Sequence, residues 1–198
     1  MDEVGAVHEA IERHVEEHFG PIEFVFHAVP STGVHVLVTE PTQDRPHRTL
    51  VTQGMSDEPM TVPDGVSPFA ELMMALPKEW PIEDLNAHNS WPVHLIKYLA
   101  AFPHENGTWL GEWHLLPNGA PAVPYAPNTE FAGMVITPML NVRAEAREID
   151  GKINLLAVVP LHPAEIQLKI DKGSGALIEA FDRAGVSELV DPRRPSSV

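Results

Sequence analysis

Apolar positions divide the chain into an N-terminal helix and a series of short strands. Five apolar side chains recur at helical spacing near the N-terminus: Val4, Val7, Ile11, Val15 and Phe19. This spacing predicts an amphipathic helix over residues 2–19, and Gly20-Pro21 predicts its end. Further on, short apolar runs bounded by turn residues predict strands at 22–27, 34–39, 48–54, 130–137 and 153–159.

Two other regions are less regular. The run from Phe69 to Leu76 is too short for periodicity to separate a strand from a short helix, so both remain open. Closing helices are predicted at 163–170 and 175–184, the second capped by Ser174. A turn is predicted at Pro30-Ser31-Thr32-Gly33.

Residues 91–119 form the densest block of pattern. Ser90 is predicted to cap a helix that tolerates Pro92 in its first turn and ends at Phe102-Pro103. Residues 108–116 then predict a returning strand that carries two tryptophans. No catalytic motif lies in this block, which indicates a protein that works by presenting a surface.

Strands and helices alternate without a regular βαβ period. This order predicts an α+β domain with a mixed, largely antiparallel sheet and helices packed on its faces. We expect a single domain over residues 1–190, followed by a flexible polar tail at 191–198.

Composition narrows the class of function. The chain has 198 residues, no cysteine and a formal net charge of −15, so disulfides and cysteine nucleophiles are excluded. Such charge repels nucleic acid and anionic membranes and favours a basic protein partner, although it also serves solubility. The acidic N-terminus lacks an apolar segment, and the longest apolar run, Leu155–Leu161, is too short to span a bilayer. We therefore expect a soluble cytoplasmic protein without a cofactor.

One motif suggests metal chemistry. His14, Glu17 and His18 match H-x-x-E-H, in which two histidines one helical turn apart bind zinc and the glutamate is the general base. The alternative is packing, because His18 falls just inside one edge of the apolar stripe, His14 falls on its border, and no third ligand stands in a characteristic context. A zinc-dependent hydrolase thus remains the alternative function.

Four stretches together resemble the Suppressor of fused domain family. They are Gly54-Met55-Ser56-Asp57, then Phe69-Ala70-Glu71-Leu72, then Trp91-Pro92 with Leu95-Ile96 and Leu99-Ala100, and finally Ile153–Val159 followed by Ala164-Glu165-Ile166. They occur in the family's order over roughly residues 20–185.

The resemblance implies a mixed α/β domain that binds another protein and has no catalytic activity. In eukaryotic members this domain is the N-terminal lobe, and a second lobe helps clamp a transcription-factor peptide. Single-domain members resemble bacterial proteins, several of which are thought to act as immunity proteins that neutralise toxins. An acid of the eukaryotic family that contacts the partner is similar in position to Asp64, and Asp57 lies in the same loop. A third hypothesis is a regulatory subunit that pairs a peptide with an exposed strand edge.

Overall fold

An open sheet forms the centre of the molecule. The computed structural model describes residues 3–28, 33–84, 88–140 and 144–198. The strands are β1 (Ile22–Phe26), β2 (His35–Thr39), β3 (His47–Gln53), β4 (Ala70–Pro77), β5 (Leu115–Pro117), β6 (Gly133–Pro138), β7 (Glu148–Ile149) and β8 (Ile153–Leu161). Their order is β1-β2-β3-β4-β8-β6-β5, with β7 also on β8, and among these described strands β4 and β8 form the only parallel pair. The predicted mixed, largely antiparallel sheet is confirmed.

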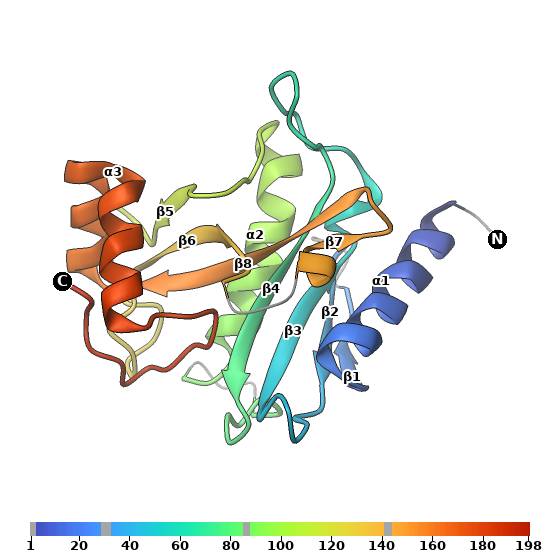
Figure 1. Cartoon of the computed structure of the whole chain (residues 1–198), viewed down its shortest axis with the longest axis horizontal. Helices are drawn as coiled ribbons and strands as arrows, with labels where there is room; N and C mark the ends of the chain where they lie inside the picture. The colour runs from blue at the N-terminus through green and yellow to red at the C-terminus, as the bar shows by residue number, and fades with distance from the viewer. Residues whose placement is uncertain (1–2, 29–32, 85–87, 141–143) are drawn as a thin grey trace.

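The three α-helices of the described residues cover the two faces of the sheet (Figure 1). They are α1 (Glu3–Phe19), α2 (Trp91–Asn106) and α3 (Pro163–Ala184). Alternate side chains of β8 separate the faces, since successive residues of a strand point to opposite sides. Leu156 packs in the core beneath α2, whereas Leu155 packs beneath α1 and Val159 beneath α3. The helices α1 and α3 therefore share one face, and α2 covers the other.

The region that periodicity left open is a strand. Every residue of β4 up to Leu76 is buried, because β3 and β8 flank the strand and helices cover both faces. A strand of this kind has no polar side to create alternation, which is why its apolar run resembled a helix segment.

Three predictions around α2 were wrong. The helix passes Pro103 and ends at Asn106, where Gly107 adopts a left-handed conformation (φ 59°) and donates its N–H to Pro103 O. A proline in the last turn can be accommodated there, so it does not end the helix one turn early. Ser90 precedes the helix but makes no capping side-chain hydrogen bond. The predicted strand at 108–116 is mostly irregular, and only β5 forms.

The C-terminal third matches its predicted breaks. Gly173 has non-helical geometry (φ 82°) and divides α3 into two helical segments, as expected.

The turn predicted at residues 30–33 lies, except for Gly33, outside the described residues. In the helices that the structure describes, no stretch is both long and apolar enough to cross a membrane.

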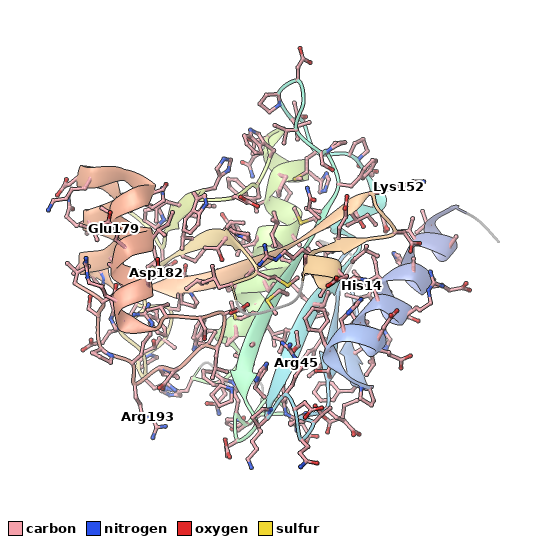
Figure 2. The ribbon with its side chains drawn as sticks, in the orientation of Figure 1. His14, Arg45, Lys152, Glu179, Asp182 and Arg193 are labelled. Carbon is pink, nitrogen blue, oxygen red and sulfur yellow. The ribbon has the colours of Figure 1, made fainter. Side chains whose placement is uncertain are left out.

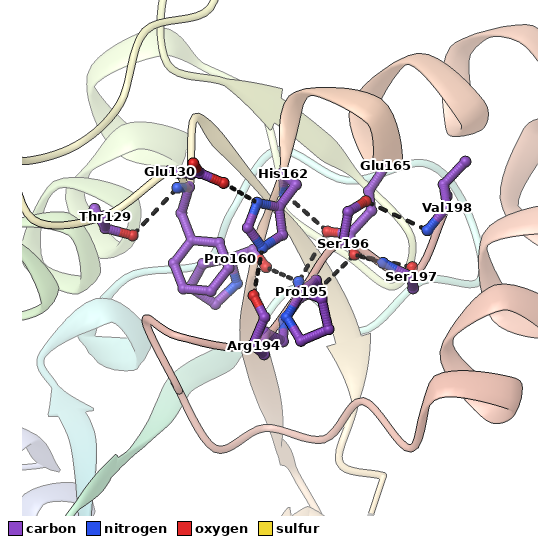
Figure 3. A network of polar contacts seen from close by, with 11 residues as sticks. Thr129, Glu130, Pro160, His162, Glu165, Arg194, Pro195, Ser196, Ser197 and Val198 are labelled. Carbon is purple, nitrogen blue, oxygen red and sulfur yellow. Dashed lines mark hydrogen bonds and ion pairs between the residues drawn. The ribbon is translucent and has the colours of Figure 1, made fainter.

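The segment expected to be a flexible tail is held by polar contacts in the structure (Figure 3). Arg194 donates to both carboxylate oxygens of the buried Glu165, at 2.6 and 2.8 Å, and to Pro160 O at 2.9 Å. Its guanidinium also lies 5.0 Å from the centre of the Phe131 ring. Ser197 adds hydrogen bonds from its backbone N–H and its hydroxyl to the same carboxylate. Nothing in the sequence of the tail signalled this anchor.

Candidate functional site

Two of the motifs singled out in the sequence meet at Glu71. The Glu71 side chain is fully buried in β4, and its Oε1 accepts hydrogen bonds from Gly54 N (3.1 Å), Ser56 N (3.0 Å) and Ser56 Oγ (2.7 Å). Its other oxygen lies 2.6 Å from Thr52 Oγ1. The Gly-Met-Ser-Asp and Phe-x-Glu-Leu motifs thus form one buried polar anchor.

Burial dominates the electrostatics of this anchor. Desolvation raises the pKa of the Glu71 carboxyl, and the hydrogen bonds from Ser56, Thr52 and Gly54 offset part of that rise. Gly54 adopts φ 123°, and a Cβ at this position would lie 2.8 Å from Gly33 O, so glycine is required. The anchor fixes the short helical turn η1 (Met55–Asp57) at the end of β3.

The turn η1 is also fastened to α1. His8 Nε2 lies 2.9 Å from Asp57 Oδ1, and each side chain is about one-quarter exposed, at 25% and 26% respectively. Beside them, Gln53 Nε2 donates to Glu12 Oε1 and to His8 O, both at 3.1 Å. These contacts place Asp57 against the N-terminal half of α1.

A hollow of about 550 Å³ opens between α1, η1 and the turn joining β7 to β8; we call it the α1 groove. Its apolar lining comes from Val4, Ala6, Val7, Ala10, Pro59, Phe69 and Ile153. Asp57, Asp150 and Lys152 are the charged residues among those that line it. The groove therefore combines an apolar lining with charged side chains, as protein and ligand sites do.

Acidic side chains are frequent on the elements that line this groove. The acidic face comprises α1, η1 with Glu58, and residues 145–152, which include β7 beside α1 (Figure 1). Its acids, exposed or half-buried, are Glu9, Glu12, Glu16, Glu17, Asp57, Glu58, Glu145, Glu148 and Asp150, against the bases Arg13, Arg147 and Lys152. On α3, by contrast, Asp171, Glu179 and Asp182 are matched by Lys169, Lys172 and Arg183. Figure 2 shows Lys152 close to α1 and Glu179 and Asp182 on α3, at the other end of the molecule.

The two predicted contact residues occupy different settings. Asp57 lines the α1 groove, whereas Asp64 stands exposed in a turn and is not among the residues that line it. The neighbours of Asp64, Gly65 and Val66, line a second hollow of about 350 Å³. Both acids are accessible on the surface, and their role as partner contacts stays a prediction.

The proposed zinc motif finds no support. His14 is buried, and its Nε2 lies 3.1 Å from Ala146 O, an arrangement in which this nitrogen carries a proton and donates. Burial lowers the pKa of His14, so the ring favours the neutral form. His18 stacks obliquely against it with ring centres 4.4 Å apart. Within the described ranges, no three His, Cys, Asp or Glu side chains are placed to hold a metal ion.

A histidine cluster lies next to the His8–Asp57 contact and was missed in the sequence. The His35 ring centre is 6.1 Å from that of His8 and 5.6 Å from that of His27, and its Nδ1 accepts the Ala28 N–H at 3.3 Å. Burial first, and then the neighbouring His8, His27 and Lys97, lower the pKa of His35. Residues from α1, β2 and the end of β1 meet here only through the fold, so no sequence spacing marks them.

Comparisons with known proteins give a consistent result. The family model for Suppressor of fused protein (SUFU) matches residues 30–195. The crystal structure of a SUFU homolog from Neisseria gonorrhoeae FA 1090 has a TM-score of 0.72 at 16% identity, covering 98% of each chain. A chain of the Sufu-Fu complex crystal structure has a TM-score of 0.67 at 14% identity, covering 96% of this chain and 92% of that one. Drosophila Suppressor of Fused gives 0.53 at 16% identity, over 83% of this chain and 42% of that one. No curated protein sequence matches the chain.

Proposed function

The chain belongs to the Suppressor of fused family, and on that premise we propose that it is a non-catalytic domain that binds a basic partner protein through its acidic face. The family supports a protein-binding role, since one structurally similar chain comes from a complex of Sufu with Fu. The observation that carries the proposal is the unequal distribution of charge, with acids concentrated on α1, η1 and residues 145–152. A field of one sign on one face accelerates association with an opposite surface and orients the encounter.

We further propose that the partner is a toxin and that binding neutralises it. A toxin that acts on nucleic acid carries basic side chains that contact phosphates. Carboxylates on the acidic face would compete for the same side chains, so binding would block the substrate. The net charge of −15 supports this inhibitor role over a role in binding nucleic acid.

Affinity capture from the native cells tests the proposal when three variants are compared. The acidic-face variant carries Glu9→Gln, Glu16→Gln and Glu17→Gln, all at exposed positions. The matched α3 variant carries Asp171→Asn, Glu179→Gln and Asp182→Asn, which remove the same charge elsewhere. We expect wild type and the α3 variant to retain one basic protein in equimolar amount and to inhibit its activity. Equal retention by the acidic-face variant would contradict the proposal.

A second candidate is peptide binding by strand addition at β1. This strand lies at one end of the sheet and pairs only with β2 among the described strands, and Phe24 and Phe26 beside its free edge are half-buried. A segment added there would gain main-chain hydrogen bonds. Its binding would depend little on salt, which separates it from the acidic-face proposal.

A further inference from the structure

The α1 groove has the lining of a docking site for an apolar side chain, inside a charged surround. Val4 is 43% exposed although it belongs to the apolar stripe of α1, and Val7 and Phe69 in the groove are half-buried. When a partner covers an apolar lining that is open to water, binding is favoured by about 25 cal/mol per Å² of apolar surface buried. The acidic face supplies attraction at long range, and this lining supplies a place for close contact.

The elements around the groove decide the shape of its occupant. The lining comes from α1, from η1 and the loop that follows it, and from the turn between β7 and β8. Phe69, just before β4, and Ile153, the first residue of β8, complete it. An extended peptide binds by pairing with an unpaired strand edge, and no such edge lines the groove among the described residues. An amphipathic helix needs no main-chain partner, because it binds through apolar side chains on one face.

The charges around the groove indicate which charged side chains the occupant carries. Asp57 and Asp150 line the groove, and Glu9 and Glu58 are exposed on the elements that flank it. The lining contains one basic residue, Lys152, and two acidic residues, Asp57 and Asp150. Basic side chains beside the apolar stripe of a docked helix would therefore meet carboxylates.

We infer that the α1 groove binds a basic amphipathic helix of the partner protein, with an aliphatic side chain of that helix inserted between Val4, Phe69 and Ile153. This inference rests on the proposed function, because it takes the acidic face as the surface that attracts the partner. It adds that binding needs correct spacing of apolar residues in the partner and not positive charge alone.

Two synthetic 18-residue peptides of leucine and lysine test this inference. In the first, leucines recur at i, i+3, i+4 and i+7; in the second, the same residues are redistributed so that no apolar face forms. Fluorescence anisotropy with the intact protein should show the amphipathic peptide binding at least about tenfold more tightly than the redistributed one. Val4→Asn should remove most of that difference, about tenfold, whereas Val123→Asn, at a 52% exposed valine outside the groove, should leave it unchanged.

The outcomes separate this inference from the proposed function. Equal, salt-sensitive binding of both peptides overturns the groove inference but agrees with a basic partner on the acidic face. Failure of both peptides to bind at low salt overturns the inference and also contradicts the electrostatic part of the proposed function. NMR shifts provide a second readout that needs no variant: the Val4, Val7 and Ile153 methyl groups should move on binding and the Val123 methyl groups should not.

Discussion

His8 Nε2 and Asp57 Oδ1 lie 2.9 Å apart, which fastens the first helix to the turn that follows β3. The contact involves a predicted partner-binding residue, which lines the α1 groove and belongs to the acidic face. The backbone next to Asp57 is fixed as well, because the preceding Ser56 donates two hydrogen bonds to Glu71. The position of this carboxylate is thus fixed before any partner arrives.

Reversing the charge of Asp57 and Asp64 together should weaken partner affinity at least about tenfold, because both acids are accessible and a like charge facing a basic partner repels it. Isothermal titration with the captured partner measures this effect. His8→Ala is the control for position: it removes the contact to Asp57 and keeps the carboxylate. Unchanged affinity after the double reversal would eliminate both residues as contacts.

Glu71→Leu should lower the free energy of unfolding by about 3 kcal/mol, because it leaves the half-buried N–H of Gly54 and the buried N–H of Ser56 without an acceptor. Glu71→Gln keeps an acceptor oxygen and should cost less than about 1 kcal/mol at pH 7. Urea unfolding measures both. Equal losses in the two variants would show that the hydrogen bonds do not carry the anchor.

The pH dependence of the Glu71 anchor follows from its raised pKa. Compared with the unfolded chain, the folded state favours the neutral form of the Glu71 carboxyl. The contribution of this preference to the free energy of unfolding is therefore full below the ordinary pKa of 4.5, and it is lost as pH rises through the folded pKa. Glu71→Gln should remove that component from the stability profile. A profile identical to that of wild type would contradict the assignment.

Arg194→Ala should destabilise the protein by about 3 kcal/mol, because it leaves the Glu165 carboxylate buried without its cation. The neighbouring Arg193 is the matched control: its side chain is 93% exposed, and Arg193→Ala should change stability by no more than about 0.5 kcal/mol. Arg194 also offsets the effect of burial and keeps the pKa of Glu165 below its ordinary value, so the stabilisation present above pH 4.5 is lost as pH falls through the folded pKa. Equal unfolding midpoints of the two variants would mean that the tail is not anchored by this pair.

Stability should decrease as pH falls below about 6.5, because burial lowers the pKa values of His14, His35 and His47. The unfolded chain then binds protons that the folded chain does not, and unfolding becomes easier. His14→Gln keeps a donor for Ala146 O and should flatten the profile between pH 7 and 5. His94→Gln, at an exposed position on α2, is the control, and equal slopes in all three proteins would contradict the prediction.

The sequence predicted the elements that have strong local patterns. The apolar stripe of α1 and the apolar runs of β6 and β8 located these elements within a few residues. Local pattern failed where tertiary packing decides. The apolar run of β4 has no periodicity because both of its faces are covered, and Pro103 lies in the last turn of α2 without ending it. Likewise, the tail at 191–198 is polar in sequence, yet Arg194 finds its partner 29 residues earlier in the chain.

The candidate site was only partly accessible to sequence reasoning. The motifs that carry the family resemblance indicated Asp57, but they did not indicate that Ser56 and Glu71 anchor one another. The acidic face joins α1 to residues more than 100 positions away, such as Asp150, which contacts Arg13. Net charge predicted a basic partner, whereas the place where charge concentrates depends on topology, which composition does not contain.

The most direct test of the acidic face is the association rate of the captured partner as a function of ionic strength. Stopped-flow measurements on wild type and the α3 variant should show rates that fall steeply between low and physiological salt, because counter-ions screen the attraction beyond about 10 Å. The acidic-face variant, with three glutamates of α1 neutralised, should associate more slowly at low salt and depend less on salt. An association rate that is independent of salt in wild type, or equal in the two variants at every salt concentration, would contradict the account.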